Sequence, residues 1–422
     1  MASPESLSTD PYKGVRDFYP EDWALLQAVF DRARTTLRTY GFEEYQASPL
    51  ERAELYERKT SEEIVAEQTY TFTDRGDRKV TLRPEMTPTL ARMIAGRRRE
   101  LVYPCRWFSI GNRFRYERPQ KGRLREFYQI DVDIVGSEGV DAELEIVQLA
   151  HALFSSFGAQ ESDFVIKVNS RALLNAACTA SGLNEEEATA YLGLLDRMNK
   201  LSPEAFEEAR APYRKNGNDP LECIQAKEDA QVVAEYEALS LLIQNWHKEG
   251  MTNVVFDPSV VRGFLYYTGL VFEVFDTNPE NPRALMGGGR YDGLMSLFGV
   301  DALPAVGFAL GDVTLLDFLR SHNLLPASSS APTVCVGVPS PEDRVHAKRY
   351  ADALRSRGIS TVVYAGKKGL GDQVKEAVRR HIPFFVAYGA AEVDAPTLTL
   401  KTLNESREDV LSPEEVLIRI KG

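Results

Sequence analysis

Hydrophobic residues recur along the first part of the chain with a changing period, which predicts a mixture of helices and strands. Residues 20–40 place apolar side chains every three to four positions and end before Gly41, as an amphipathic helix with a glycine cap does. Residues 127–135 alternate apolar with polar or acidic side chains, which favours an antiparallel strand. A strand that enters a helix at Pro84 is expected at residues 80–83, and further strands are expected at 269–275 and 305–310.

The pattern changes further along the chain and indicates separate domains. Residues 171–248 are rich in Ala, Leu and Glu at helical spacing and predict a helical insertion. Residues 325–332 have the composition of a linker, and residues 333–422 alternate strand and helix patterns as a small α/β domain does. We therefore expect a core built from residues 1–170 and 249–324. In the terminal domain, strands are expected at 334–338, 360–364, 384–388 and 398–403, and helices at 342–357, at 371–380 and near the end.

Composition and charge narrow the class of protein. A chain of 422 residues with 43% hydrophobic residues suggests two or three ordinary domains. It has no apolar run long enough to span a membrane and no signal pattern at its start, so a soluble cytoplasmic protein is expected. Its four cysteines lack metal-ligand spacing, and we expect neither a metal site nor disulfides. The net charge of −12 argues against a general nucleic-acid coat, although a local basic patch still suits one polyanion.

Positive charge is concentrated in one loop against this acidic background. Residues 113–125 carry six Lys or Arg side chains and a single acid, Glu117. Arg115 and Arg123 suit bidentate phosphate binding, and Phe127 suits stacking on a purine, so the loop points to ATP. The alternative is a surface hairpin with solvated arginines.

Two other clusters carry candidate chemistry. Glu85 and Thr87 form an acceptor pair that suits an ammonium group, or equally a capping arrangement at a helix start. Arg262, with the paired tyrosines Tyr266 and Tyr267, suits a polar pocket, and the glycine run at 287–289 permits close approach of the backbone. A glycine run alone is weak support for a site.

Together these segments resemble the class II aminoacyl-tRNA synthetases, and specifically the histidyl-tRNA synthetase family, over nearly the whole chain. Gly14-Val-Arg-Asp-Phe and residues 41–51 look like the opening and the first class II motif, and residues 114–129 look like the second. Arg262-Gly-Phe-Leu-Tyr-Tyr and Gly288-Gly-Arg-Tyr-Asp-Gly look like the two histidine-specific signatures. The resemblance implies an α+β core with an antiparallel sheet flanked by helices, a helical insertion, a terminal α/β anticodon-binding domain and a homodimer.

The resemblance also implies roles for individual residues. Arg115 would bind the α-phosphate of ATP, Glu117 would contact adenine and Phe127 would stack on it. Arg262 would bridge the histidine carboxylate and the α-phosphate, and Asp133 with Tyr267 would face the imidazole. The remaining implied contacts are Glu85, Thr87 and Gln129 for the amino group of histidine, Tyr266 for its pocket, and Arg118, Gln120, Lys121 and Arg123 for tRNA, with Arg123 near the nucleotide as well.

The implied function is a histidine–tRNA ligase that uses ATP with Mg²⁺ as a substrate, has no prosthetic group, and binds L-histidine and tRNA(His). Three features depart from the family pattern: Leu265 stands where Asp is common, Asp133 stands where bacterial members often have Glu, and Val313-Thr314 stands where the third class II motif usually has Glu-Arg. The usual arginine there grips the γ-phosphate of ATP. Two alternatives therefore stay open: a regulatory paralogue that senses histidine, and a catalytically impaired relative that binds RNA.

Overall fold

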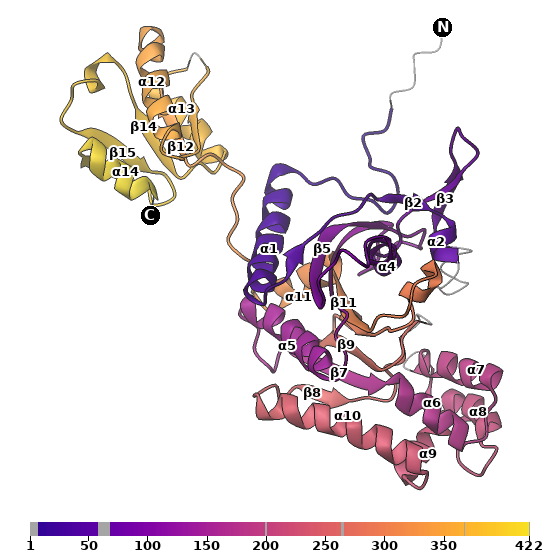
Figure 1. Ribbon diagram of the computed structural model, residues 1–422. Coiled ribbons are helices and arrows are strands. Elements are labelled where there is room, and N and C mark those ends of the chain that lie inside the picture. The colour runs from indigo at the N-terminus through magenta and orange to yellow at the C-terminus, as the bar shows by residue number, and fades with distance from the viewer. Residues whose placement is uncertain (1–6, 58–67, 199–200, 263–265, 367, 422) are drawn as a thin grey trace. The chain divides into compact units, whose positions relative to one another are not determined.

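An eight-stranded sheet forms the centre of the first of two units, residues 1–327 and 328–422, into which the chain divides (Figure 1). The computed structural model describes residues 7–57, 68–198, 201–262, 266–366 and 368–421. The strand order is β1-β5-β6-β11-β10-β9-β7-β8, antiparallel from β5 to β7 and parallel at both edges. The strands are Glu43–Glu44 (β1), Cys105–Phe114 (β5), Glu126–Val135 (β6), Phe164–Ser170 (β7), Val254–Phe256 (β8), Leu270–Asp276 (β9), Ala284–Arg290 (β10) and Ala305–Gly311 (β11).

Helices cover one face of this sheet and leave the other for the site. The covering helices are Pro20–Thr39 (α1), Asp141–Ser156 (α5) and Asp312–Ser321 (α11). On β6, Ile130, Val132 and Ile134 join the core beneath these helices, so the residues that alternate with them face the opposite side. The predicted helix over 20–40 and the antiparallel strand over 127–135 are thus confirmed.

Residues 50–96 form a smaller three-stranded sheet and two helices. The sheet has the order β2-β4-β3, and its strands are Leu50–Arg52 (β2), Tyr70–Thr73 (β3) and Lys79–Leu82 (β4). The helices are Glu54–Glu57 (α2) and Thr87–Gly96 (α4). The helix expected to start at Pro84 starts instead at Thr87, because Pro88 occupies its first turn. Pro84 and Glu85 therefore lie outside both the strand and the helix, and the Glu85 carbonyl accepts a hydrogen bond from the Tyr56 hydroxyl at 3.2 Å.

The segment 171–248 is helical, as its spacing predicts. Its helices are Arg171–Ala180 (α6), Glu185–Leu195 (α7), Pro203–Arg210 (α8), Pro220–Ala226 (α9) and Ala230–Lys248 (α10), and they gather beside β7 and β8 (Figure 1). Asn184 with Glu187 and Asp219 with Glu222 form capping boxes, in which each side chain satisfies an otherwise unpaired backbone N–H. Local sequence thus sets where these helices begin.

The second unit is a five-stranded sheet in the order β13-β12-β14-β15-β16. Its strands are Val334–Gly337 (β12), Thr361–Val363 (β13), Phe384–Ala387 (β14), Leu398–Thr402 (β15) and Arg407–Leu411 (β16), and its helices are Arg344–Arg355 (α12), Leu370–Arg379 (α13) and Pro413–Lys421 (α14). Every expected element is present, and β16 is an additional one. The strand β16 escaped prediction because it is an exposed edge strand whose charged side chains lack an apolar period.

The cysteines and the helices can be described directly. All four cysteines are free, and Cys105, Cys178 and Cys335 are buried among apolar neighbours. Among the described helices, none has the length and apolar character that a membrane crossing requires.

Candidate active site

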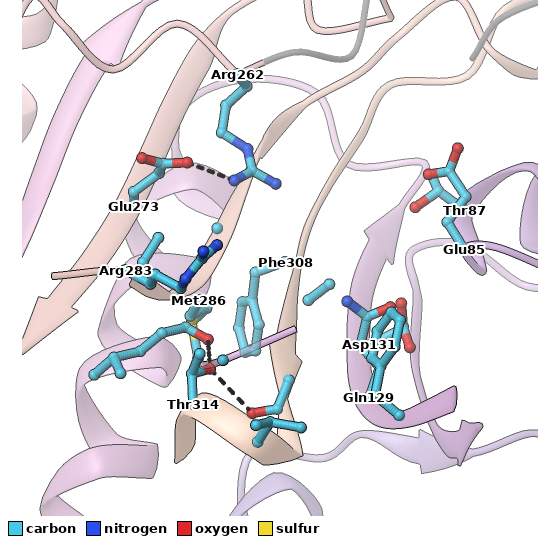
Figure 2. A pocket seen from close by; sticks show the side chains of 18 of the residues that line it. Glu85, Thr87, Gln129, Asp131, Arg262, Glu273, Arg283, Met286, Phe308 and Thr314 are labelled. Atoms are coloured by element: carbon cyan, nitrogen blue, oxygen red, sulfur yellow. Dashed lines mark hydrogen bonds and ion pairs between the residues drawn. The ribbon is translucent and has the colours of Figure 1, made fainter. Parts of the chain in front are cut away.

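A cavity of about 460 Å³ lies on the sheet face that the helices leave open (Figure 2). Most of the residues to which the sequence assigns a role line it, namely Glu85, Thr87, Arg115, Glu117, Arg123, Phe127, Gln129, Asp133, Arg262, Tyr266 and Tyr267. Gln120 and Lys121 instead line a smaller neighbouring cavity of about 230 Å³, and Arg118 lines neither. Residues separated by up to 182 positions in sequence, from Glu85 to Tyr267, therefore meet in one volume suited to a small ligand.

The polar side of β6 forms the acidic floor of this cavity. Gln129, Asp131 and Asp133 alternate with the core residues of the same strand, so all three face the cavity. Asp133 accepts a hydrogen bond from the Tyr291 hydroxyl at 2.5 Å, and burial raises the pKa of its carboxyl to about 8, with the Asp131 charge acting in the same direction. The buried Oε1 of Gln129 has no hydrogen-bond partner among the described residues, so it is available to a ligand donor.

Glycines in β10 and β11 leave the space in which the polar side chains lie. A Cβ on Gly307 would fall 2.1 Å from Oδ1 of Asp133, and a Cβ on Gly287 would fall 2.1 Å from Nη1 of Arg262. A Cβ on Gly289 would fall 2.8 Å from the Tyr267 ring. Such contacts are far inside van der Waals distance, so these glycines are needed for room rather than for an unusual backbone conformation.

Arg262 enters the cavity from a strained backbone position. Its φ angle of 61° is left-handed, which costs a residue with a side chain on the order of 1 kcal/mol or more. Its Nη1 donates to Glu273 Oε1 at 2.6 Å, while its buried Nε has no hydrogen-bond partner among the described residues (Figure 2). Strain of this kind is typical of functional sites. Leu265, which departs from the family pattern, lies outside the described residues.

Glu85 and Tyr266 form another wall of the cavity. The Tyr266 hydroxyl donates to Oε2 of Glu85 at 3.1 Å, and burial raises the pKa of Tyr266 well above its ordinary value. Glu85 and Thr87 both border the cavity from the start of α4 (Figure 2). This wall therefore presents oxygen acceptors, which suit a ligand ammonium group.

The basic loop supplies cations and one aromatic ring. Arg115 Nε donates to the Pro84 carbonyl at 3.0 Å, and its guanidinium carbon lies 5.3 Å from the centre of the Phe127 ring. Arg123 forms an ion pair with Glu117 at 3.1 Å. Burial lowers the pKa of Arg115, which indicates that its charge is held in a partly desolvated place where an anion would stabilise it. This end of the cavity therefore suits a phosphate beside a planar base.

One arginine of the basic loop belongs to the core instead. Arg113 is fully buried and forms an ion pair with Asp131 at 2.5 Å, so it has no role in phosphate binding. The sequence groups it with the other basic residues of 113–125, but position 113 still belongs to β5.

The structure adds cavity residues that the sequence did not single out, namely Asp131, Glu273, Arg283, Met286, Tyr291 and Phe308. Asp131 lay within the alternating segment 127–135 and Tyr291 within the motif that starts at Gly288, so both were detectable, whereas nothing in the pattern distinguished Arg283. No group of three or more His, Cys, Asp or Glu side chains in the described part of the chain is arranged to hold a metal ion.

The raised pKa of Asp133 predicts a pH-dependent gain in stability for Asp133→Asn. The folded protein keeps a proton at Asp133 up to about pH 8, while the unfolded chain releases it above about pH 4. Asp133 therefore lowers the free energy of unfolding progressively as pH rises from 4 to 8, by about 1.4 kcal/mol per unit. The asparagine variant should have a higher melting temperature than the wild type at pH 7.5, and the difference should shrink at pH 5.

Asp131→Asn is the matched control, since it lies two residues away on the same strand face. It leaves the buried Arg113 without its partner and should lower the melting temperature at both pH values. An equal difference between Asp133→Asn and wild type at pH 5 and pH 7.5 would contradict the raised pKa.

Comparison with known proteins assigns this fold and cavity to a class. A family model described as histidyl-tRNA synthetase matches residues 14–315, and one described as an anticodon binding domain matches residues 334–422. The antiparallel core with its cavity is thus that of a class II aminoacyl-tRNA synthetase. The chain belongs to the histidyl-tRNA synthetase family.

Individual relatives support this membership over the full length. The chain is 39% identical to a histidine–tRNA ligase of Leptospira biflexa, with 99% of this chain and 98% of the relative aligned. It is 36% identical to one of Opitutus terrae, with 97% of each aligned. The crystal structure of a histidyl-tRNA synthetase from Nostoc superposes with a TM-score of 0.81 over 99% of both chains at 21% identity, which supports the fold.

Proposed function

We propose that the protein is a histidine–tRNA ligase that joins L-histidine to the 3′ end of tRNA(His) through a histidyl-adenylate. The observation that carries this function is the full-length match to relatives of that name, combined with a cavity that places carboxylates at one end and arginines at the other. The regulatory alternative is not favoured, because the anticodon-binding model matches residues 334–422.

Histidine would bind across the floor and the wall of the cavity. Its ammonium group would take acceptors from Glu85, Thr87 and the free Oε1 of Gln129. Its imidazole would lie against Asp133, whose carboxyl keeps acceptor capacity for one ring N–H even when it is protonated, with Tyr266 and Tyr267 closing the pocket and the Tyr267 hydroxyl addressing the other nitrogen. An apolar amino acid would leave these buried groups unpaired, so discrimination on the order of 10⁴ is expected without an editing site.

Adenylate formation would take place between the two ends. The histidine carboxylate attacks the α-phosphorus of ATP, and pyrophosphate leaves. Arg115 and Arg262 would stabilise the charge that develops on the α-phosphate oxygens, and Phe127 with Glu117 would hold the adenine.

We further propose that ATP enters with Mg²⁺, which neutralises the departing pyrophosphate.

The tRNA would contact two parts of the chain. Its acceptor end would meet the loop that carries Arg118, Gln120, Lys121 and Arg123 beside the cavity, and its anticodon would meet the terminal domain.

We also propose that the protein carries out this reaction in the cytoplasm. A homodimer is proposed too, since Leu50 and Phe72 of the small sheet expose 43% and 49% of their surface.

Aminoacylation tests the proposed function directly. With radiolabelled histidine, ATP and tRNA(His), the protein should convert tRNA into acid-precipitable histidyl-tRNA, and omission of ATP should stop the reaction. A protein that binds histidine and tRNA but yields no histidyl-tRNA would instead be the catalytically impaired relative.

A further inference from the structure

The cavity contains one cation that the loop and the known signatures do not account for. Arg283 lies at the end of the turn between β9 and β10 and lines the cavity together with Glu117 and Arg123, and Figure 2 shows it near Thr314. Among the described residues it makes no hydrogen bond and no ion pair, whereas Arg123 is paired with Glu117 and Arg262 with Glu273. Its charge is therefore left for a ligand.

The turn that carries Arg283 is firmly anchored. Asp276, at the end of β9, accepts from the backbone N–H of Asn278 and from the Asn281 amide at 2.8 Å each, and His322 Nε2 also lies 2.8 Å from it. Lys121 of the basic loop donates to the Glu280 carbonyl at 2.9 Å from the other side. These contacts fix where Arg283 enters the cavity.

The basic loop also makes room for Arg283. A Cβ on Gly122 would fall 2.7 Å from Cδ of Arg283 and 3.6 Å from Cγ2 of Thr314, so the arginine passes directly beneath the loop and next to Thr314. Burial and the nearby charge of Arg123 lower the pKa of Arg283. Two arginines that repel each other at the mouth of one cavity are stabilised when an anion lies between them.

Thr314 itself is committed to the backbone. Its single O–H is shared between the carbonyls of Leu285 at 3.3 Å and Gly311 at 3.4 Å, as the dashed lines in Figure 2 show. A threonine in that position has neither a charge nor a spare donor for phosphate.

We infer that Arg283 supplies the cation that binds the terminal phosphates of ATP, from the β9–β10 turn rather than from α11. This inference rests on the proposed function, because it assumes that ATP lies with its α-phosphate at Arg115 and Arg262. The triphosphate then extends past Arg123 toward Arg283. The same residue would bind pyrophosphate in the reverse reaction.

The test is the Arg283→Ala variant in ATP–pyrophosphate exchange. Loss of a charged contact to phosphate should raise the KM for ATP by about 10- to 100-fold, with the KM for pyrophosphate rising in parallel. The KM for histidine should stay within about twofold, since Arg283 does not touch the acidic floor. Arg283→Lys should be intermediate, and the exposed Arg320→Ala on α11 serves as the matched control without effect.

Relocating the charge gives the sharper version of the test. In the double variant Arg283→Ala with Thr314→Arg, the cation returns to α11 beside the same space, and the KM for ATP should recover at least in part. Equilibrium binding should show that Arg283→Ala weakens ATP strongly and AMP little. Equal loss for ATP and AMP, or an unchanged KM for ATP, overturns the inference.

A raised KM for tRNA with an unchanged KM for ATP also overturns it and makes Arg283 a tRNA contact. Should wild-type protein show no histidine-dependent exchange, the proposed function fails. The ratio of AMP to ATP dissociation constants in Arg283→Ala then still decides the inference by itself.

Discussion

Arg262→Ala should reduce histidine-dependent ATP–pyrophosphate exchange by about 10³-fold or more while weakening histidine binding only about 10-fold. The guanidinium would hold the charge that builds on the α-phosphate, an interaction stronger in the transition state than in the complex with histidine alone. Its strained backbone, with a φ angle of 61°, and its ion pair with Glu273 fix it in the cavity before ATP arrives. The measurements are exchange kinetics and calorimetric titration of histidine.

The matched variant for this prediction is Arg262→Lys, which keeps one charge but loses the planar fork. It should retain a small part of the exchange activity. Near-normal exchange in Arg262→Ala would show that the role is wrongly assigned, and a parallel collapse of histidine binding would show that Arg262 acts mainly on histidine.

Gly287→Ala should reproduce the loss seen in Arg262→Ala without touching a charged residue. The added methyl group would fall 2.1 Å from Nη1 of Arg262, and the three nearest atoms all belong to that side chain. The guanidinium must therefore move out of its place, whereas the backbone of β10 need not. A reduction of exchange by about 10²-fold or more is expected, with little change in melting temperature.

Gly293→Ala is the control, because the same substitution six residues later meets no atom within 4 Å. When Gly287→Ala is added to Arg262→Ala, the exchange activity should fall little further, because the guanidinium that the new methyl group displaces is already absent. Independent, additive losses would mean that Gly287 acts on the fold rather than through Arg262.

Local pattern predicted those parts of the fold where one face is buried and the other is not. The helix α1, the strand β6 and the helices between residues 171 and 248 have clear apolar periods or side-chain caps. The strand β10 was harder to predict, because Gly287, Gly288 and Gly289 lack side chains and glycine is unfavourable in strands. Only the assembled cavity shows why they are tolerated: larger residues would displace Arg262 and Tyr267.

The candidate site was predictable where charge contrasted with its surroundings. Arg115, Glu117 and Arg123 stand out in an acidic chain, and the alternation of β6 placed Gln129 and Asp133 on one face. Arg283 had no such signal. Its importance depends on the contacts of Asp276 with the turn and on what Thr314 binds, and both are properties of the assembled structure. The burial that separates Arg113 from its neighbours is likewise a tertiary effect.

Amino-acid-dependent ATP–pyrophosphate exchange by the wild-type protein tests the central claim most directly. Each standard amino acid would be supplied in turn with ATP, Mg²⁺ and labelled pyrophosphate. We predict rapid exchange with histidine and a kcat/KM at least about 10⁴-fold lower with any apolar amino acid. Exchange that does not depend on histidine, or that is faster with another amino acid, would contradict the account.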